Sequence, residues 1–162
     1  MRVIAGKFKS RQLKSVDSSH TRPTTDKNKE NLFNMIGPYF DGGICLDLFG
    51  GSGGLGIEAL SRGMNELYSV DKQYKAFATI RENFKLLKIE DVAHVYKMDF
   101  RKALQQFQGI LSFLDEHHML NDGCLVVVED LNEEAFEITQ PFVLKKQQSY
   151  GITTLQILEY KE

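Results

Sequence analysis

Cysteine and proline are scarce in this chain of 162 residues, and long apolar runs are absent. The two cysteines, Cys45 and Cys124, each lie in a strand-like apolar stretch, which argues against a disulfide framework and predicts reduced thiols in a cytoplasmic protein. No apolar run approaches the ~20 residues of a membrane-spanning helix. We therefore expect no membrane partner. The four histidines show no metal-ligand spacing, so we also expect no metal site.

Charge is distributed unevenly along the chain. The net charge is −2, yet residues 1–29 carry eight basic and two acidic side chains, which leaves a surplus of eight negative charges in the remainder. A basic arm on an acidic body predicts a polyanion, such as nucleic acid, as a partner at this end. The alternative is a basic hairpin that is simply solvated.

The first forty residues form an extension before a periodic region. Alternation of apolar and polar side chains around Gly6 predicts a β-hairpin over 2–13. A helix is predicted to begin at about residue 26, capped by Thr25 or Asp26, and to end before Gly37-Pro38. We therefore divide the chain into a basic hairpin-and-helix extension, residues 1–40, and a second domain, residues 41–162.

Residues 41–162 alternate strand-like and helix-like segments. Strands are predicted over 44–48, 66–70, 92–96 and 124–129, helices over 53–61, 72–87, 99–107 and 110–118, and a final antiparallel hairpin over 142–150 and 153–160. Strand–helix alternation of this kind indicates an α/β fold built on a mostly parallel sheet.

The alternation breaks once, between the helices predicted over 99–107 and 110–118. Only Gln108-Gly109 separates them, so two helices follow one another with no return through the sheet. After three strand–helix units the next strand normally lies beside the first, at the point where ligands bind. Its loss would leave backbone groups of the sheet without partners. We therefore expect that this chain lacks a strand and a following loop at the 109/110 junction, on the order of 12–25 residues.

A glycine-rich turn follows the first predicted strand of residues 41–162. The strand ends in an acid, Asp47, and glycines stand at 50, 51, 53, 54 and 56 before the next helix. Strand, glycine turn and helix N-terminus together indicate a nucleoside-cofactor site, and residues 51–56 satisfy the G-x-G-x-x-G dinucleotide pattern. Asp47 would repel a pyrophosphate but suits an ammonium or sulfonium group, so it favours S-adenosylmethionine over a nicotinamide cofactor. The alternative for Asp47 is a helix-capping acid.

Two further acids follow the next two predicted strands. Asp71 is placed to accept hydrogen bonds from both ribose hydroxyls, or to cap the helix after it. Asp99 could accept a bond from an adenine amino group, with Phe100 beside the ring, or could equally cap a helix. Three acids at the ends of three consecutive strands are more specific than any one of them.

A second signature is the segment 21–34, which reads Thr-Arg-Pro-Thr-Thr-Asp-Lys-Asn-Lys-Glu-Asn-Leu-Phe-Asn. With residues 1–9, the 47–53 loop, residues 59–63 and the closing 149–153 turn, it resembles the bacterial RsmD family. These are S-adenosylmethionine-dependent methyltransferases that act on the N2 amine of a guanine in 16S ribosomal RNA. The resemblance covers nearly the whole chain. It implies a Rossmann-like class I methyltransferase fold, S-adenosylmethionine as cofactor, and 16S rRNA or the small ribosomal subunit as partner of a monomeric enzyme.

The motifs and the resemblance together give a set of expected site residues. The cofactor site is expected to comprise Asp47, Phe49, Gly50, Gly51, Ser52, Gly53, Asp71, Lys72, Asp99 and Phe100. The bases expected to hold RNA phosphates are Arg2, Lys7, Lys9, Arg11 and Arg22.

The chain departs from the family pattern in two places. Lys29 stands where the family usually has arginine, a change that we expect to bear on phosphate contact. The family's catalytic Asp/Asn-Pro-Pro-Tyr motif is missing, because the only prolines are Pro23, Pro38 and Pro141. That motif would follow the fourth strand, at the 109/110 junction, so the catalytic residues stay unassigned. Three alternatives remain open: a DNA adenine or cytosine amino-methyltransferase, a nicotinamide-dependent oxidoreductase, and a non-catalytic RNA-binding module.

Overall fold

The structure is a computed structural model that describes residues 1–16, 24–99, 116, 120–131, 138, 140–150 and 153–161. The chain divides into two compact units, Met1–Ala103 and Leu104–Glu162. The first unit contains α1 (Asp26–Ile36), β1 (Ile44–Asp47), α2 (Gly54–Ser61), β2 (Glu66–Asp71), α3 (Tyr74–Leu87) and β3 (Ala93–Lys97). The second contains β4 (Leu125–Leu131), β5 (Phe142–Tyr150) and β6 (Thr153–Tyr160).

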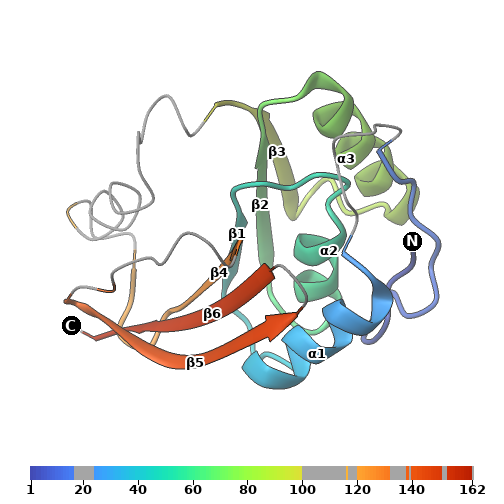
Figure 1. Cartoon of the computed structure of the whole chain (residues 1–162). Coiled ribbons are helices and arrows are strands. Elements are labelled where there is room, and N and C mark those ends of the chain that lie inside the picture. Colours follow the sequence, from blue (N-terminus) through green and yellow to red (C-terminus); the bar gives the residue numbers. More distant parts are fainter. Residues whose placement is uncertain are drawn as a thin grey trace. The chain divides into compact units, whose positions relative to one another are not determined.

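The sheet of the first unit is parallel, as the strand–helix alternation predicts. Its order is β1-β2-β3, so that β2 lies in the middle and the carboxyl ends of all three strands share one edge. Helices α2 and α3 lie on the same side of this sheet in Figure 1. Their apolar faces supply Ile57, Ile80 and Phe84 to a core that also holds Leu67 of β2. Helix α1 begins at the predicted residue, and the Thr25 hydroxyl caps it by accepting a hydrogen bond from the Asn28 N–H.

The N-terminal arm, residues 1–14, is not the regular β-hairpin that its alternation predicts. Its two limbs are joined by one antiparallel bridge, between Arg2 and Gln12, and by a few backbone hydrogen bonds, while bends and turns occupy residues 5–10. The N–H groups of Ile4 and Ala5 donate to the Glu58 carboxylate in α2 rather than to an opposite strand. Burial of polar backbone groups requires partners, and here α2 supplies them. The predicted antiparallel pairing of the two limbs is thus confirmed in part, whereas regular strands do not form because a distant carboxylate accepts two of the N–H groups.

The second unit contains an antiparallel sheet of order β4-β6-β5, with the predicted hairpin over 142–150 and 153–160 confirmed to the residue. Val128, Phe142, Leu158 and Tyr160 form its core. The helices predicted over 99–107 and 110–118 lie outside the described residues, apart from Asp99 and Glu116, and the 109/110 junction also lies outside them. Within the described residues, no helix has the length and apolar character needed to cross a bilayer.

Both sheets end on an apolar strand. Among the described residues, β1 pairs only with β2, and β4 pairs only with β6. The apolar side chains of β1 are exposed accordingly, Ile44 to 67% and Leu46 to 43%. An exposed apolar edge strand is a liability that native proteins usually cover.

Candidate functional site

The glycine turn connects the carboxyl end of β1 to the start of α2 and is held against the neighbouring strand. The Gly50 N–H donates to the Val70 carbonyl at 2.9 Å, and the Gly53 N–H donates to the Gly50 carbonyl at 2.6 Å. Gly53 has φ of 81°, a left-handed conformation that favours glycine, and it is the N-cap of α2. The turn is therefore anchored on β2 and leads directly into a helix N-terminus.

Asp47 lies at the end of β1, where its carboxylate accepts backbone hydrogen bonds from Phe49 and Gly56. Desolvation raises the pKa of this carboxyl to about 6, although those two hydrogen bonds oppose the rise. Among the described residues no lysine, arginine or histidine forms an ion pair with it. A desolvated carboxylate without a cationic partner in the described protein is suited to a cationic group on a ligand.

Asp71 lies at the end of β2 and connects two turns. One of its oxygens accepts from the Gly51 N–H at 3.0 Å, and the other accepts from the Gln73 N–H at 2.8 Å. Gln73 is the N-cap of α3, so Asp71 also supports the start of that helix, as the alternative interpretation allows. Each carboxylate oxygen accepts more than one hydrogen bond, so ribose hydroxyls can still be bound.

A hollow of about 380 Å³ lies beside Asp71, at the carboxyl ends of β2 and β3. It is lined by Lys72, Gln73, Lys97, Met98 and Asp99. Met98 is half-exposed there, and its N–H donates to the Asp71 carbonyl at 3.0 Å. The structure thus brings Asp47, the glycines, Asp71, Lys72 and Asp99 to one edge of the parallel sheet, whereas Phe100 lies outside the described residues.

The expected RNA-binding bases have different surroundings. Lys7, Lys9 and Arg11 are exposed on the arm. Arg2 forms a 3.0 Å ion pair with Asp26, and Arg22 lies outside the described residues. Lys29 is buried, and its ammonium lies 2.5 Å from the Arg2 carbonyl and 3.4 Å from the Glu58 carboxylate. The expected phosphate contact of Lys29 is therefore wrong.

Three polar residues around the site were not predicted from the sequence. Glu58 and Ser61 in α2 bind the arm, and Asn83 in α3 binds both the arm and the glycine turn through the Ser52 carbonyl. Their one visible signal is position, because each stands on a helix face that is otherwise apolar and buried. A polar side chain in such a place needs partners, but the sequence does not identify them.

The part of the chain that the structure describes contains no group of three histidine, cysteine, aspartate or glutamate side chains placed to hold a metal ion. Cys45 and Cys124 are free and half-buried, and desolvation raises the pKa of the Cys45 thiol to about 12.

Comparison with solved structures shows the fold. The methyltransferase yhhF from Escherichia coli superposes with a TM-score of 0.85 at 25% identity, over 99% of this chain and 98% of that one. An RNA methyltransferase from Salinibacter ruber, solved in complex with S-adenosyl-L-homocysteine, superposes with a TM-score of 0.62 at 16% identity, over 87% of this chain and 95% of that one. The Rossmann-like class I methyltransferase fold is thereby confirmed.

Sequence relatives show the family. YlbH of Bacillus subtilis, whose name assigns it to the rRNA methyltransferases, is 44% identical, with 97% of each chain covered. Ribosomal RNA small subunit methyltransferase D of Haemophilus influenzae is 28% identical, over 98% of this chain and 93% of the relative. The model of the family described as Conserved hypothetical protein 95 matches residues 1–110. The chain therefore belongs to this family, the RsmD family of bacterial rRNA methyltransferases.

Proposed function

We propose that this protein serves methyl transfer from S-adenosylmethionine to the exocyclic N2 amine of a guanine in 16S ribosomal RNA. The observation that carries the proposal is the Asp47 carboxylate, which lies beside the glycine turn with no cationic partner among the described residues. The names of the relatives support an rRNA substrate, and the Salinibacter ruber neighbour, solved with S-adenosyl-L-homocysteine, supports the cofactor.

The residues at the sheet edge fit this cofactor. Asp47 would face its ammonium or sulfonium group, Asp71 its ribose hydroxyls, and Asp99 with Met98 its adenine. When bound, S-adenosylmethionine supplies a methyl group that passes to the amine nitrogen, while the carbon–sulfur electron pair stays on sulfur and the amine loses a proton. The chain's part is to align donor and acceptor, because alignment supplies much of the rate in such transfers. The exposed Lys7, Lys9 and Arg11 would hold RNA phosphates.

We propose that a segment is absent from this chain between Gly109 and Ile110. That segment would hold the acceptor base. The alignment with YlbH spans 179 positions, although 97% of this chain is only about 157 residues, so about 22 positions have no counterpart here. The alignment with the Haemophilus influenzae protein leaves about 21 in the same way. The family match ends at residue 110, and the two sheets end on β1 and β4. A segment of this length is long enough for a strand and a loop, and the loop would carry the acceptor site.

The cofactor is tested by calorimetry with two ligands. We expect S-adenosylhomocysteine to bind and NAD not to bind, because a carboxylate in the turn repels a pyrophosphate. Asp47→Ala should abolish binding of S-adenosylhomocysteine. Asp91→Ala, a change at an exposed acid in the loop before β3, is the control. Binding of NAD, or wild-type affinity in Asp47→Ala, would contradict the assignment.

The reaction is tested by restoring the absent segment. The corresponding residues of YlbH are inserted between Gly109 and Ile110, and both chains are assayed with labelled S-adenosylmethionine on 16S rRNA and on DNA. We expect the extended chain alone to transfer methyl, with N2-methylguanosine in the digested RNA. Methylated adenine or cytosine in DNA would support the alternative amino-methyltransferase. Equal activity of the two chains would refute the absent segment. RNA binding without transfer by the extended chain would leave a non-catalytic module.

We further propose that the protein works as a monomer in the cytoplasm. Sedimentation of the purified chain at micromolar concentration and fractionation of the cells that express it check these two points.

A further inference from the structure

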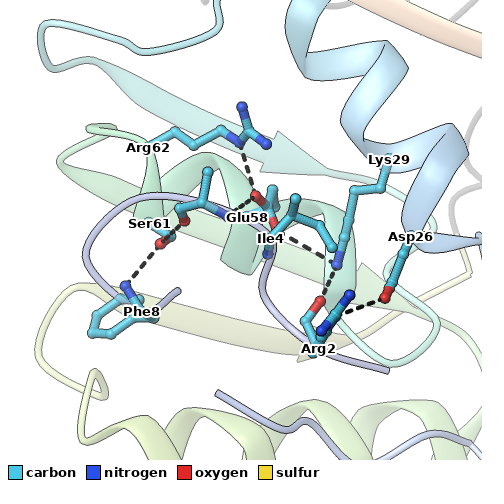
Figure 2. Close-up of polar contacts among 9 residues, drawn as sticks. Arg2, Ile4, Phe8, Asp26, Lys29, Glu58, Ser61 and Arg62 are labelled. Carbon is cyan, nitrogen blue, oxygen red and sulfur yellow. Dashed lines mark hydrogen bonds and ion pairs between the residues drawn. The ribbon is translucent and has the colours of Figure 1, made fainter. Parts of the chain in front are cut away.

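One buried carboxylate connects three segments of the first unit. Glu58 is fully buried in α2, and Figure 2 shows the groups that converge on it. The N–H groups of Ile4 and Ala5 in the arm donate to its two oxygens at 2.8 and 3.0 Å. The Arg62 guanidinium, from the end of α2, donates at 2.8 Å, and the Lys29 ammonium of α1 lies at 3.4 Å.

Ser61, one turn further along α2, fixes the next part of the arm. Its hydroxyl donates to the Ala5 carbonyl at 2.6 Å and accepts from the Phe8 N–H at 2.9 Å, and its own carbonyl accepts from the Lys7 N–H at 2.8 Å. The φ of Gly6 is 80°, and a side chain there would overlap the Ser61 carbonyl. The arm is thus held to the end of the helix that begins at the glycine turn.

Asn83 provides a second connection, between the end of the arm and the glycine turn itself. This buried side chain accepts from the Lys14 N–H at 2.8 Å and donates to the Lys14 carbonyl at 3.0 Å. Its amide also donates to the Ser52 carbonyl at 2.9 Å. One side chain therefore binds the backbone of the arm and the backbone of the proposed cofactor turn.

These polar contacts add to apolar packing, because Val3 and Leu13 of the arm are buried in the core with Ile57. Its two limbs are also joined to each other, by the bridge between Arg2 and Gln12 and by backbone hydrogen bonds such as that from the Val3 N–H to the Arg11 carbonyl at 3.0 Å. Release of the arm would leave the carboxylate of Glu58 beside two buried cations and without its backbone donors, which is unfavourable in a buried site. The arm and the glycine turn are therefore held through the same set of buried polar side chains.

We infer that Glu58, Ser61 and Asn83 are positioning residues that couple RNA binding by the arm to cofactor binding at the glycine turn. The inference rests on the proposed function, which places RNA on the exposed lysines and the cofactor at Asp47. Both ligands favour the arrangement in which these shared contacts are ordered, so each binds more tightly when the other is present. The factor is the same in both directions because the binding free energies are linked. When both ligands are bound, the entropic cost of ordering the shared contacts is incurred only once.

The coupling is measured as the affinity for transcribed 16S rRNA with and without saturating S-adenosylhomocysteine. We expect about tenfold tighter RNA binding with S-adenosylhomocysteine in the unaltered chain, within the usual range for allosteric coupling. In Glu58→Gln and Asn83→Ala the ratio should fall below about threefold, because the contacts between arm and turn are lost. Glu82→Gln is the matched control, since Glu82 neighbours Asn83 and pairs with Lys14 on the exposed surface at 2.9 Å.

Ser61→Ala keeps the test decisive if the buried variants do not fold, because it removes two arm contacts and leaves the charged cluster intact. It should lower the ratio at unchanged cofactor affinity in the absence of RNA. A ratio near one in the unaltered chain overturns the coupling alone. An unchanged ratio in Ser61→Ala and in every folded variant also overturns it. Absence of RNA binding overturns the proposed function and the coupling together.

Discussion

Two glutamates, one in each unit, lie between a pair of basic side chains, and their surroundings differ completely. Glu58 in the first unit is inaccessible to solvent, as are Lys29 and Arg62 beside it. Glu159 in the second unit contacts Lys145 at 3.4 Å and Lys161 at 3.3 Å, and both lysines are more than half exposed. The same charges thus form a junction of three segments in one place and surface pairs in the other.

The difference extends to how each unit is held together. The first unit has an apolar core too, but residues more than fifty positions apart are also joined by partly buried hydrogen bonds, as between Ala5 and Glu58. In the second, alternating strands bury apolar side chains such as Phe142 and Leu158 against one another. Polar junctions specify one arrangement, whereas apolar packing tolerates exchange of similar side chains. The unit that carries the proposed cofactor and RNA surfaces is the one that adds buried polar junctions to its apolar core.

The largest expected effect is the loss of the buried carboxylate. Glu58→Ala should lower the free energy of unfolding by about 3–5 kcal/mol, because two buried cations and two backbone N–H groups lose their partner. Glu159→Ala should change stability little, because its partners are hydrated. Urea titration of both variants tests the comparison. Similar losses in the two variants would show that burial does not distinguish the two clusters.

The next effect concerns Asp47 and depends on pH. Burial raises the pKa of this carboxyl from 3.8 to about 6, so the folded state holds the proton more tightly than the unfolded state. Its favourable contribution is complete below pH 3.8 and is lost as the pH rises through about 6. Asp47→Asn should therefore be more stable than the unaltered chain at pH 7.5, by about 1–3 kcal/mol.

Unfolding of both chains at several pH values measures this difference, which should shrink toward pH 4. Affinity for S-adenosylhomocysteine should instead rise between pH 5 and 7 in the unaltered chain, as the carboxylate forms. Asp130→Asn in the second unit is the control. A stability difference that does not vary with pH would contradict an elevated pKa of Asp47.

How far the sequence predicts the fold depends on the range of the interactions. Local signals sufficed for α1, whose cap Thr25 stands next to it, and for the hairpin that forms β5 and β6. The position of Asp47 and Asp71 at the ends of predicted strands likewise indicated that they lie at one edge of the sheet, where the structure has them. The antiparallel limbs of the arm were predicted, but the contact of two of its N–H groups with Glu58, more than fifty residues away, was not. No local pattern contains that pairing, and the burial of Lys29 follows from the same contact.

A smaller effect is expected from the exposed charges of the arm. Reversal of Lys7 and Lys9 to glutamate should weaken binding to 16S rRNA about tenfold or more. It should also reduce the slope of the logarithm of the association constant against the logarithm of salt concentration by about two. Cofactor affinity in the absence of RNA should not change. Reversal of Lys145 and Lys146 in the second unit alters the same number of exposed lysines and is the control. Equal effects of the two reversals would indicate attraction by overall charge rather than by the arm.

The smallest expected effect is at Ser69, in the middle strand of the parallel sheet. Its side chain is fully buried, and its hydroxyl has no hydrogen-bond partner within the described part of the chain. Burial of an unpaired hydroxyl is unfavourable, so Ser69→Ala should raise the free energy of unfolding by up to about 1 kcal/mol. Ser149→Ala is the contrast in the second unit, because that exposed hydroxyl lies 2.9 Å from the Thr154 hydroxyl, and its loss should be neutral or slightly destabilising. Destabilisation by Ser69→Ala would mean that the hydroxyl is hydrogen-bonded in solution, so that every buried side-chain polar atom among the described residues of the first unit would have a partner.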